Sequence, residues 1–243
     1  NEPGEESDIT DELIEQLASF EGIDLSSNYI DVNVQGNKAA IQVFKNKNVY
    51  LNVDNQNRGM QFKDVSKDVW YYNSIKYCYD NGIIMGTTDT TFSPNNKLTR
   101  GNLVTILWRM EGEPKVGGEQ KFPDVKTSDY YYEAVKWAEK NRIVSGYDNG
   151  KFGPNNYITR EQLATILKNY ADYKKKDTSA RADLSTFTDE KGISSYAREG
   201  IAWAVANKVM SGKNNGTRVD PRGNATRAEA AAMIQNYCYY VGR

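Results

Sequence analysis

The pattern of apolar positions divides the chain into a helical part and an extended part. From residue 62 onward, apolar residues recur at three- and four-residue spacing in paired segments, and a polar loop separates the members of each pair. This period is typical of amphipathic helices, so the sequence predicts a helix–loop–helix unit that returns along the chain. The first helix is predicted over roughly 68–81, with Trp70, Ile75 and Cys78 on its inner face.

Residues 1–61 follow other patterns. Helical spacing begins at Thr10, which suits an N-cap, and stops at Gly22. The period then changes to two, which predicts short antiparallel strands around 30–34, 41–43 and 49–53. We therefore expect a small α+β segment of one helix and about three strands. Because about 60 residues are marginal for an independent core, we expect this segment either to pack on the repeats or to be the tail of a larger upstream domain.

Two sets of residues recur with the same offsets in the helical part. The Thr-Arg pairs and the loop prolines are both spaced by 60 and then by 67 residues. The residues are Thr99-Arg100, Thr159-Arg160, Thr226-Arg227, Pro94, Pro154 and Pro221. Independent landmarks in the same register establish an internal repeat. The repeats are predicted over about 62–110, 122–171 and 187–241.

Further landmarks precede each Thr-Arg pair in a fixed order. They are Phe62-Lys63-Asp64-Val65, Phe122-Pro123-Asp124-Val125, Phe187-Thr188-Asp189, Met85-Gly86, Ser145-Gly146 and Ser211-Gly212. This ordered set resembles the S-layer homology (SLH) motif, and three tandem copies resemble the SLH trimer that anchors surface proteins to Gram-positive cell walls. The resemblance covers residues 62–241. It implies a mainly α, pseudo-three-fold domain over 62–243 behind the 1–61 segment, and an extracellular location at the cell wall.

Composition and charge limit the classes of binding partner that the chain is expected to have. Hydrophobic residues make up 39% of the chain without a run near the length of a membrane span, so we expect no membrane insertion. Residues 62–243 hold 27 Lys and Arg against 21 Asp and Glu, a net charge of +6, whereas residues 1–61 carry 4 against 11, a net charge of −7. The mild positive charge favours an anionic partner or is ordinary scatter, and it is far from a nucleic-acid-binding signature.

The cysteines and the absence of histidine exclude common metal and cofactor chemistry. With no histidine and no Cys-x-x-Cys, a zinc site is not expected, and neither is a cofactor. Cys78 and Cys238 lie in apolar helical stretches, where buried free thiols are the simpler interpretation and a single bridge between the first and last repeats is the alternative.

The Thr-Arg pairs allow a structural and a functional interpretation. Thr159 with Gln162 and Thr226 with Glu229 fit a capping box, whereas Asn102 is short for this role behind Thr99. Capping does not explain the arginine, whose charge at a helix start costs about 0.3–1 kcal/mol. An arginine beside free helix N–H groups would bind a carboxylate. The alternative is an ion pair with an aspartate of a neighbouring repeat, from among Asp64, Asp124 and Asp189.

The aromatic residues and glycines are equally ambiguous. Trp70, Tyr130 and Tyr196 occupy matching positions, where aromatic rings either fill the core or stack on the C–H faces of sugars. Trp137 and Trp203, further along the same helices, are predicted to be core. The turn glycines need positive φ or let a ligand approach the backbone closely. They are Gly86, Gly146 and Gly212.

The resemblance implies a function for these residues. In the family, grooves between repeats bind a secondary cell-wall polysaccharide, typically with a pyruvate ketal on N-acetylmannosamine. By resemblance, Arg100, Arg160 and Arg227 would bind the carboxylate, beside Gln162 and Glu229. The aspartates, aromatic residues and turn glycines named above would form the walls. Only the third copy reads Thr-Arg-Ala-Glu in full, so we expect non-equivalent grooves, of which one or two need not bind.

We therefore expect a non-catalytic, monomeric anchoring module. It starts at Asn1 without a signal peptide and is expected to be a mature or trimmed fragment. One alternative is a protein-interaction or self-assembly module of a surface layer or adhesin. A glycosidase with paired carboxylates is a further alternative, although no acidic residue stands in a recognisable catalytic pattern.

Overall fold

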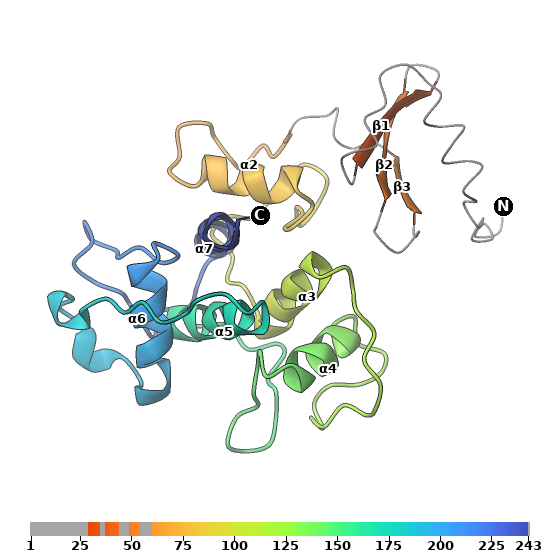
Figure 1. The fold of residues 1–243 in the computed structure, drawn as a ribbon. Coiled ribbons are helices and arrows are strands. Elements are labelled where there is room, and N and C mark those ends of the chain that lie inside the picture. Colours follow the sequence, from red (N-terminus) through yellow and green to blue (C-terminus); the bar gives the residue numbers. More distant parts are fainter. Residues whose placement is uncertain (1–28, 35–36, 44–48, 54–59, 243) are drawn as a thin grey trace. The chain divides into compact units, whose positions relative to one another are not determined.

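The computed structural model of the chain describes residues 29–34, 37–43, 49–53 and 60–242. The chain divides into two compact units, Asn1–Gly59 and Met60–Arg243. In the first unit, β1 (Tyr29–Val34), β2 (Asn37–Val43) and β3 (Val49–Val53) form an antiparallel sheet in the order β1-β2-β3 (Figure 1). This confirms the strands predicted from the alternation. The helix predicted between Thr10 and Gly22 lies outside the described residues.

The described part of the second unit is helical, as predicted. Each repeat contributes two α-helices with a loop between them (Figure 1). The pairs are α2 (Tyr72–Asp80) with α3 (Arg100–Met110), α4 (Tyr132–Lys140) with α5 (Arg160–Tyr173), and α6 (Arg198–Ala206) with α7 (Arg227–Val241). Short 3-10 helices η1 (Leu184–Thr186), η2 (Glu190–Gly192) and η3 (Ser195–Ala197) precede α6. No helix of the described residues is long and apolar enough to span a membrane.

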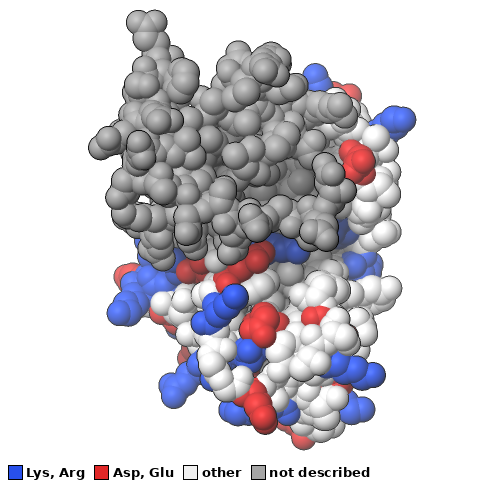
Figure 2. All heavy atoms as spheres, turned by 90° about the vertical axis from the view of Figure 1, so that its right-hand side faces the viewer, with Lys and Arg blue, Asp and Glu red and all other residues white. Residues whose placement is uncertain are grey.

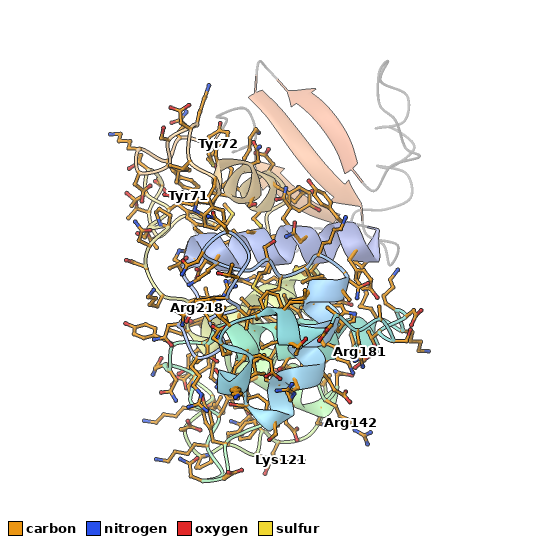
Figure 3. All side chains as sticks on the ribbon, turned by 90° about the vertical axis from the view of Figure 1, so that its left-hand side faces the viewer. Tyr71, Tyr72, Lys121, Arg142, Arg181 and Arg218 are labelled. Atoms are coloured by element: carbon orange, nitrogen blue, oxygen red, sulfur yellow. The ribbon has the colours of Figure 1, made fainter. Side chains whose placement is uncertain are left out.

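The helices close into a ring of three repeats. The first helix of each repeat packs on the second helix of the preceding repeat, since α4 packs on α3 and α6 packs on α5. The ring closes where α2 of the first repeat packs on α7 of the third, as Figure 3 shows beside the labelled Tyr71 and Tyr72. Each of these three interfaces between α-helices therefore joins two different repeats.

Three backbone hydrogen bonds mark the pseudo-three-fold axis. The N–H of Leu98 donates to the carbonyl of Ala225 (3.0 Å), the N–H of Ile158 donates to Leu98 (2.9 Å), and the N–H of Ala225 donates to Ile158 (2.9 Å). Each of these residues directly precedes a Thr-Arg pair. The cycle therefore brings the three Thr-Arg pairs to one region of the molecule.

The core confirms part of the predicted pattern. Trp137 and Trp203 are fully buried, and the stacked rings of Tyr170 and Tyr237 (5.1 Å between centroids) join α5 to α7. Cys78 is a free thiol buried under α7, and its Sγ contacts the carbonyl of Ala231 at 3.5 Å. Cys238 is also buried and forms no disulfide with Cys78, which confirms the simpler interpretation of the two cysteines.

The predicted inner position of Trp70 is wrong. α2 begins only at Tyr72, so Trp70 lies in the preceding turn, where 68% of its surface is exposed. The matching Tyr130 and Tyr196 are 60% and 56% exposed. The helical spacing in the sequence extends too far toward the N-terminus, so it assigned these rings to the inner face of a helix that begins only after them. Core packing therefore does not explain the three aromatic residues.

Charged side chains are dispersed on the surface of the second unit. Figure 2 shows Lys and Arg interspersed with Asp and Glu on the described part of one face. A few of them form surface ion pairs, such as Lys168 with Asp172 (2.8 Å) and Lys76 with Asp80. Pairs of this kind contribute little to stability. No broad patch of one sign is seen on the described part of this face.

Candidate functional site

Each Thr-Arg pair begins the second helix of its repeat with a capping box. The hydroxyl of Thr226 accepts from the N–H of Glu229 (3.1 Å), and the Glu229 carboxylate accepts from the Thr226 N–H (2.9 Å). In the first repeat the return bond, from the Thr99 N–H to Asn102 Oδ1, is 3.4 Å long. The capping box of Thr99 and Asn102 therefore forms, although Asn102 is short for this role. Its shorter side chain makes the return hydrogen bond longer than in the third repeat.

The first backbone donors of each helix are used by the neighbouring repeat. In α5, the N–H of Arg160 donates to Gly223 (2.9 Å) and the N–H of Glu161 donates to Pro221 (2.9 Å). In α3, the N–H groups of residues 100 and 101 donate in the same way to Asn156 and Pro154. These bonds explain why the loop prolines keep a fixed offset from the Thr-Arg pairs. The free helix N–H groups expected from the sequence are thus already satisfied within the protein.

The arginine side chains make the next contacts between repeats. Arg160 donates from Nε to the carbonyl of Val219 (2.9 Å) and from Nη2 to the carbonyl of Ser211 (2.8 Å). Arg100 and Arg227 repeat the pattern in cyclic order. The Nε acceptors are Phe152 (3.0 Å) and Phe92 (2.9 Å), and the Nη2 acceptors are Ser145 (3.0 Å) and Met85 (2.7 Å). Each arginine therefore anchors the loop of the next repeat.

The repeated aspartates hold the same loops from the other side. Asp124 accepts from the N–H of Phe152 at Oδ1 (2.9 Å) and from the N–H of Gly153 at Oδ2 (2.8 Å). Asp64 and Asp189 hold the corresponding loop residues of their own repeats. We call this arrangement, in which a loop residue is bonded to an aspartate through its N–H and to an arginine through its carbonyl, the clasp.

The clasp corrects the proposed ion pairs. Within residues 60–242, no ion pair joins the clasp arginines to Asp64, Asp124 or Asp189. The arginines do hold the repeats together, as that alternative supposed, but through carbonyl oxygens. Burial lowers the pKa of all three guanidinium groups.

The turn glycines are needed for space, and the prediction of positive φ at these positions is wrong. A Cβ on Gly86 would lie 2.5 Å from the ring of Phe62, and one on Gly146 would lie 2.5 Å from the ring of Phe122. A Cβ on Gly212 would lie 2.8 Å from the carbonyl oxygen of Gly216. None of the three has a positive φ. Gly86 and Gly146 thus let the loop lie close to the beginning of its own repeat, and Gly212 lets its loop lie close to Gly216 within the same loop.

One groove combines parts of all three repeats. It has a volume of about 540 Å³ and is lined by Trp70 of the first repeat, Arg160 of the second, and Gly212, Lys213 and Glu229 of the third. We call it the Arg160 groove. The exposed indole of Trp70 lines the same groove as the charged groups. The groove thus combines a planar apolar surface with a set of hydrogen-bonding groups.

The charged groups of the Arg160 groove are mutually bonded. Lys213 Nζ lies 2.8 Å from carboxylate oxygens of both Asp220 and Glu229, and Arg160 Nη1 lies 3.8 Å from Glu229. Burial alone would raise the pKa of Glu229, but the hydrogen bonds from Lys213 and the Thr226 N–H, with Arg160 nearby, outweigh it and hold the pKa below its usual value. The groove is therefore lined by two cations and one carboxylate, and the Asp220 carboxylate holds Lys213 from outside the lining.

The equivalent places beside the other arginines are built differently. Beside Arg227, the amide of Asn102 donates to the hydroxyl of Tyr130 (2.7 Å). We call this place the Arg227 site. Beside Arg100, the ring of Tyr147 covers the guanidinium, and the hydroxyl of Tyr196 lies 3.2 Å from Glu161. We call this place the Arg100 site.

Sequence reasoning missed Lys213, Tyr147 and Glu161. The first two directly follow a turn glycine, at the position where the first repeat has Thr87. Glu161 is buried, and its carboxylate accepts from the backbone and hydroxyl of Ser194 (3.0 and 2.8 Å). The sequence does carry a signal for these residues, because the position after the turn glycine differs from repeat to repeat. A comparison limited to the shared residues overlooks it.

These observations define a class of protein: a ring of three helix–loop–helix repeats, clasped at each loop, with a groove between repeats. The S-layer homology domain family matches residues 61–101, 121–164 and 186–231. The chain belongs to this family, and its repeats form a surface-anchoring module that acts at the cell surface.

Similar proteins include both enzymes and surface-layer proteins. An endoglucanase of Bacillus sp. (strain KSM-635) is 30% identical over 77% of this chain and 20% of its own length. An amylopullulanase of Thermoanaerobacterium thermosulfurigenes is 36% identical over 71% of this chain and 9% of its own length. The surface-layer 125 kDa protein of Lysinibacillus sphaericus is 29% identical over 72% and 14%. The match thus spans a fifth or less of each of these relatives.

Proposed function

We propose that residues 60–242 anchor the protein by binding a secondary cell-wall polysaccharide in the Arg160 groove. The recognised unit is a sugar that carries a carboxylate, as in a pyruvate ketal on N-acetylmannosamine. The observation that carries this proposal is that the exposed Trp70 indole lines the same groove as Arg160 and Lys213. An apolar face with convergent polar groups is the usual composition of a small-ligand site.

The groove fits a short piece of a polysaccharide. Its volume of about 540 Å³ lies within the roughly 300–1,000 Å³ of typical ligand sites. Trp70 would stack on the C–H face of the sugar ring, which needs an aromatic surface free of protein contacts. The close backbone at Gly212 would let a ring lie against the loop. These features favour a sugar over a bare anion.

The charges in the groove suggest how the carboxylate is bound. Nε and Nη2 of Arg160 are used in the clasp, so the ligand would be bound through Nη1 and through Lys213, which now contact Glu229. A ligand carboxylate would take the place of Glu229 beside one of these cations. Glu229 would then be free to accept a hydrogen bond from a sugar hydroxyl.

The remaining predicted residues take supporting parts in this proposal. Asp189 holds the loop that carries Gly212 and Lys213, through Val219 and Asp220. We propose the same supporting role for Asp64 and Asp124 in their loops. Some relatives are named as enzymes, and those names describe the relatives. For this chain we propose only anchoring.

The test is calorimetric titration with a short wall disaccharide, with and without its pyruvate ketal. We expect binding of the pyruvylated form, a loss of at least about tenfold without pyruvate, and a loss of the same order in Trp70→Ala. Tyr157→Ala is the matched control, because Tyr157 is also an exposed aromatic residue but does not line the groove.

Two results would contradict the proposal in different ways. Equal affinity for the two disaccharides would refute carboxylate recognition and leave polysaccharide binding. No heat with either disaccharide or with the purified polymer, from a chain whose thermal unfolding is normal, would refute the polysaccharide function itself.

A further inference from the structure

A pair of loop residues in direct contact differs from repeat to repeat. One member follows the turn glycine and the other follows the residue held in the clasp. In the first repeat they are Thr87 and Ser93, whose hydroxyls lie 2.8 Å apart. In the third they are Lys213 and Asp220, an ion pair at 2.8 Å. We call these two positions the loop pair.

In the second repeat the loop pair is Tyr147 and Gly153. A Cβ on Gly153 would lie 2.6 Å from Nδ2 of Asn156 and 2.7 Å from Cε2 of Tyr147, so the tyrosine ring and the Asn156 amide together occupy the space that a side chain at position 153 would need. Gly153 also has φ +69, a conformation that the residues at this position in the other loops, Ser93 (φ 59) and Asp220 (φ 50), adopt despite their side chains. The backbone thus does not require glycine here, whereas the tyrosine ring and the Asn156 amide do.

The seated ring covers the arginine of the clasp. The Arg100 guanidinium carbon lies 4.7 Å from the centroid of the Tyr147 ring and 4.7 Å from that of Phe152, and Arg100 is 5% exposed. At the Arg227 site, where the loop pair is Thr87 and Ser93, the arginine stacks on Phe92 and remains partly exposed. Arg160 is equally buried (4% exposed), but its neighbours in the groove are the charged side chains of Glu229 and Lys213. What distinguishes the Arg100 guanidinium is therefore the tyrosine ring that covers it and not its exposed fraction.

A second contact fixes the neighbouring aromatic residue at the Arg100 site. Glu161 is buried and accepts from the hydroxyl of Tyr196, the residue that corresponds to Trp70 of the Arg160 groove. Gln162 also reaches toward the Tyr147 hydroxyl, at 3.4 Å. The residues corresponding to Glu161 are Gly101 and Ala228, which have no side-chain acceptor. Both aromatic rings of this site are thus hydrogen-bonded, and Glu161 has no counterpart with a side-chain acceptor in the other repeats.

We infer that Tyr147, seated against Gly153, closes the Arg100 site to ligand, so that at most two of the three sites bind ligand. Arg100 then serves only the clasp. Tyr147 is a specificity-determining residue because it takes the place over the guanidinium that a ligand carboxylate would need. The number of ligand sites rests on the proposed function, whereas the covering of Arg100 does not.

Phenylglyoxal modification followed by peptide mass mapping tests the covering without any glycan. We expect Arg100 to react about tenfold more slowly than Arg227 in the unaltered chain, since the stacked ring must leave first. Tyr147→Thr, and separately Gly153→Ser, copy the residues of the first repeat and should bring Arg100 close to the rate of Arg227. Tyr157→Thr is the control and should change neither rate. Equal rates in the unaltered chain, or no change in either folded variant, would overturn the inference.

Counting ligand sites distinguishes this inference from the proposed function. Native mass spectrometry with the pyruvylated disaccharide should show one more bound ligand per chain in Tyr147→Thr than in the unaltered chain. Three bound ligands per unaltered chain would overturn the closure and leave the function intact. No bound ligand in any variant would refute the function, and the labelling rates would still decide whether Tyr147 covers Arg100.

Discussion

The clasp makes a strong prediction about Arg160, which is 4% exposed. Arg160→Ala removes the donors of two charged hydrogen bonds, to the buried carbonyl of Val219 and the carbonyl of the exposed Ser211. Hydrogen bonds to charged groups contribute about 1.5–3 kcal/mol each to stability. Water can replace the donor at Ser211 more readily than at Val219, so we expect the free energy of unfolding to fall by about 3–4 kcal/mol.

Thermal and urea unfolding followed by circular dichroism measure this loss. A domain of 150–250 residues loses about 2–4 °C in Tm for each kcal/mol, so the midpoint should fall by about 6–16 °C. Arg160→Lys keeps the charge but lacks the planar fork, and it should recover only part of the loss. Arg222→Ala is the matched control, because Arg222 is exposed and makes no hydrogen bond or ion pair among the described residues.

A destabilisation below about 1 kcal/mol, the value of an ordinary surface contact, would refute the structural role of the arginine. A large one has a consequence for binding experiments. Loss of ligand binding in Arg160→Ala could then reflect a released loop. Trp70→Ala is the better test of the site, because the exposed indole contributes little to the fold.

Three further predictions concern pH, helix ends and thiols. Because the folded-state pKa of Glu229 is held below its usual value near 4.5, this group stabilises the fold above that pH and the contribution is lost as pH falls through the folded-state pKa. Tm should therefore fall in acid, and Glu229→Gln should flatten that fall; an unchanged acid profile would contradict the assignment. After the first helices, Gly82, Arg142 and Lys208 all have φ near +60°, and Arg142 is exposed (Figure 3). Arg142→Gly should raise stability by about 0.5–1 kcal/mol and Gly82→Ala should lower it by about the same amount in urea unfolding; opposite signs would show that side-chain contacts outweigh the backbone. Burial raises the pKa of the Cys78 thiol, so both buried cysteines should react with DTNB at least about a hundredfold more slowly in the folded chain than in urea. Rapid reaction of two thiols in the native state would show that α2 separates from α7.

Much of the fold is local and could be predicted from the sequence. The amphipathic periods, the Thr caps and the fixed offset of the prolines specify three helix pairs, because helix geometry and capping depend on residues within a few positions of each other. The strands around Ile30, Ile41 and Leu51 could be predicted for the same reason. In the sheet, Ile41 is paired with Ile30 on one side and with Leu51 on the other. The predicted start of the first helix was wrong, since its apolar spacing extends into the turn that carries Trp70.

The role of the arginines was decided by the tertiary structure. Arg100 reaches carbonyls 45 and 52 residues away, and Arg227 reaches carbonyls 135 and 142 residues away in the opposite direction. Every residue offers a backbone carbonyl, so no side-chain pattern marks these acceptors. The charge at the helix start indicated that the arginine had a purpose, and only the closed ring of repeats shows which groups it binds.

The differences among the three places beside the clasp arginines depend on contacts across a loop. The sequence alone shows Thr87, Tyr147 and Lys213 as an unremarkable variable position. In the fold, each contacts the residue beside the clasp, so that one loop is joined by hydroxyls, one by a ring against a glycine, and one by an ion pair. The sequence by itself determined that this protein is a three-repeat module of helix pairs. The tertiary structure decided how the places beside the three arginines differ, because their shape depends on side chains that meet only when the ring is complete.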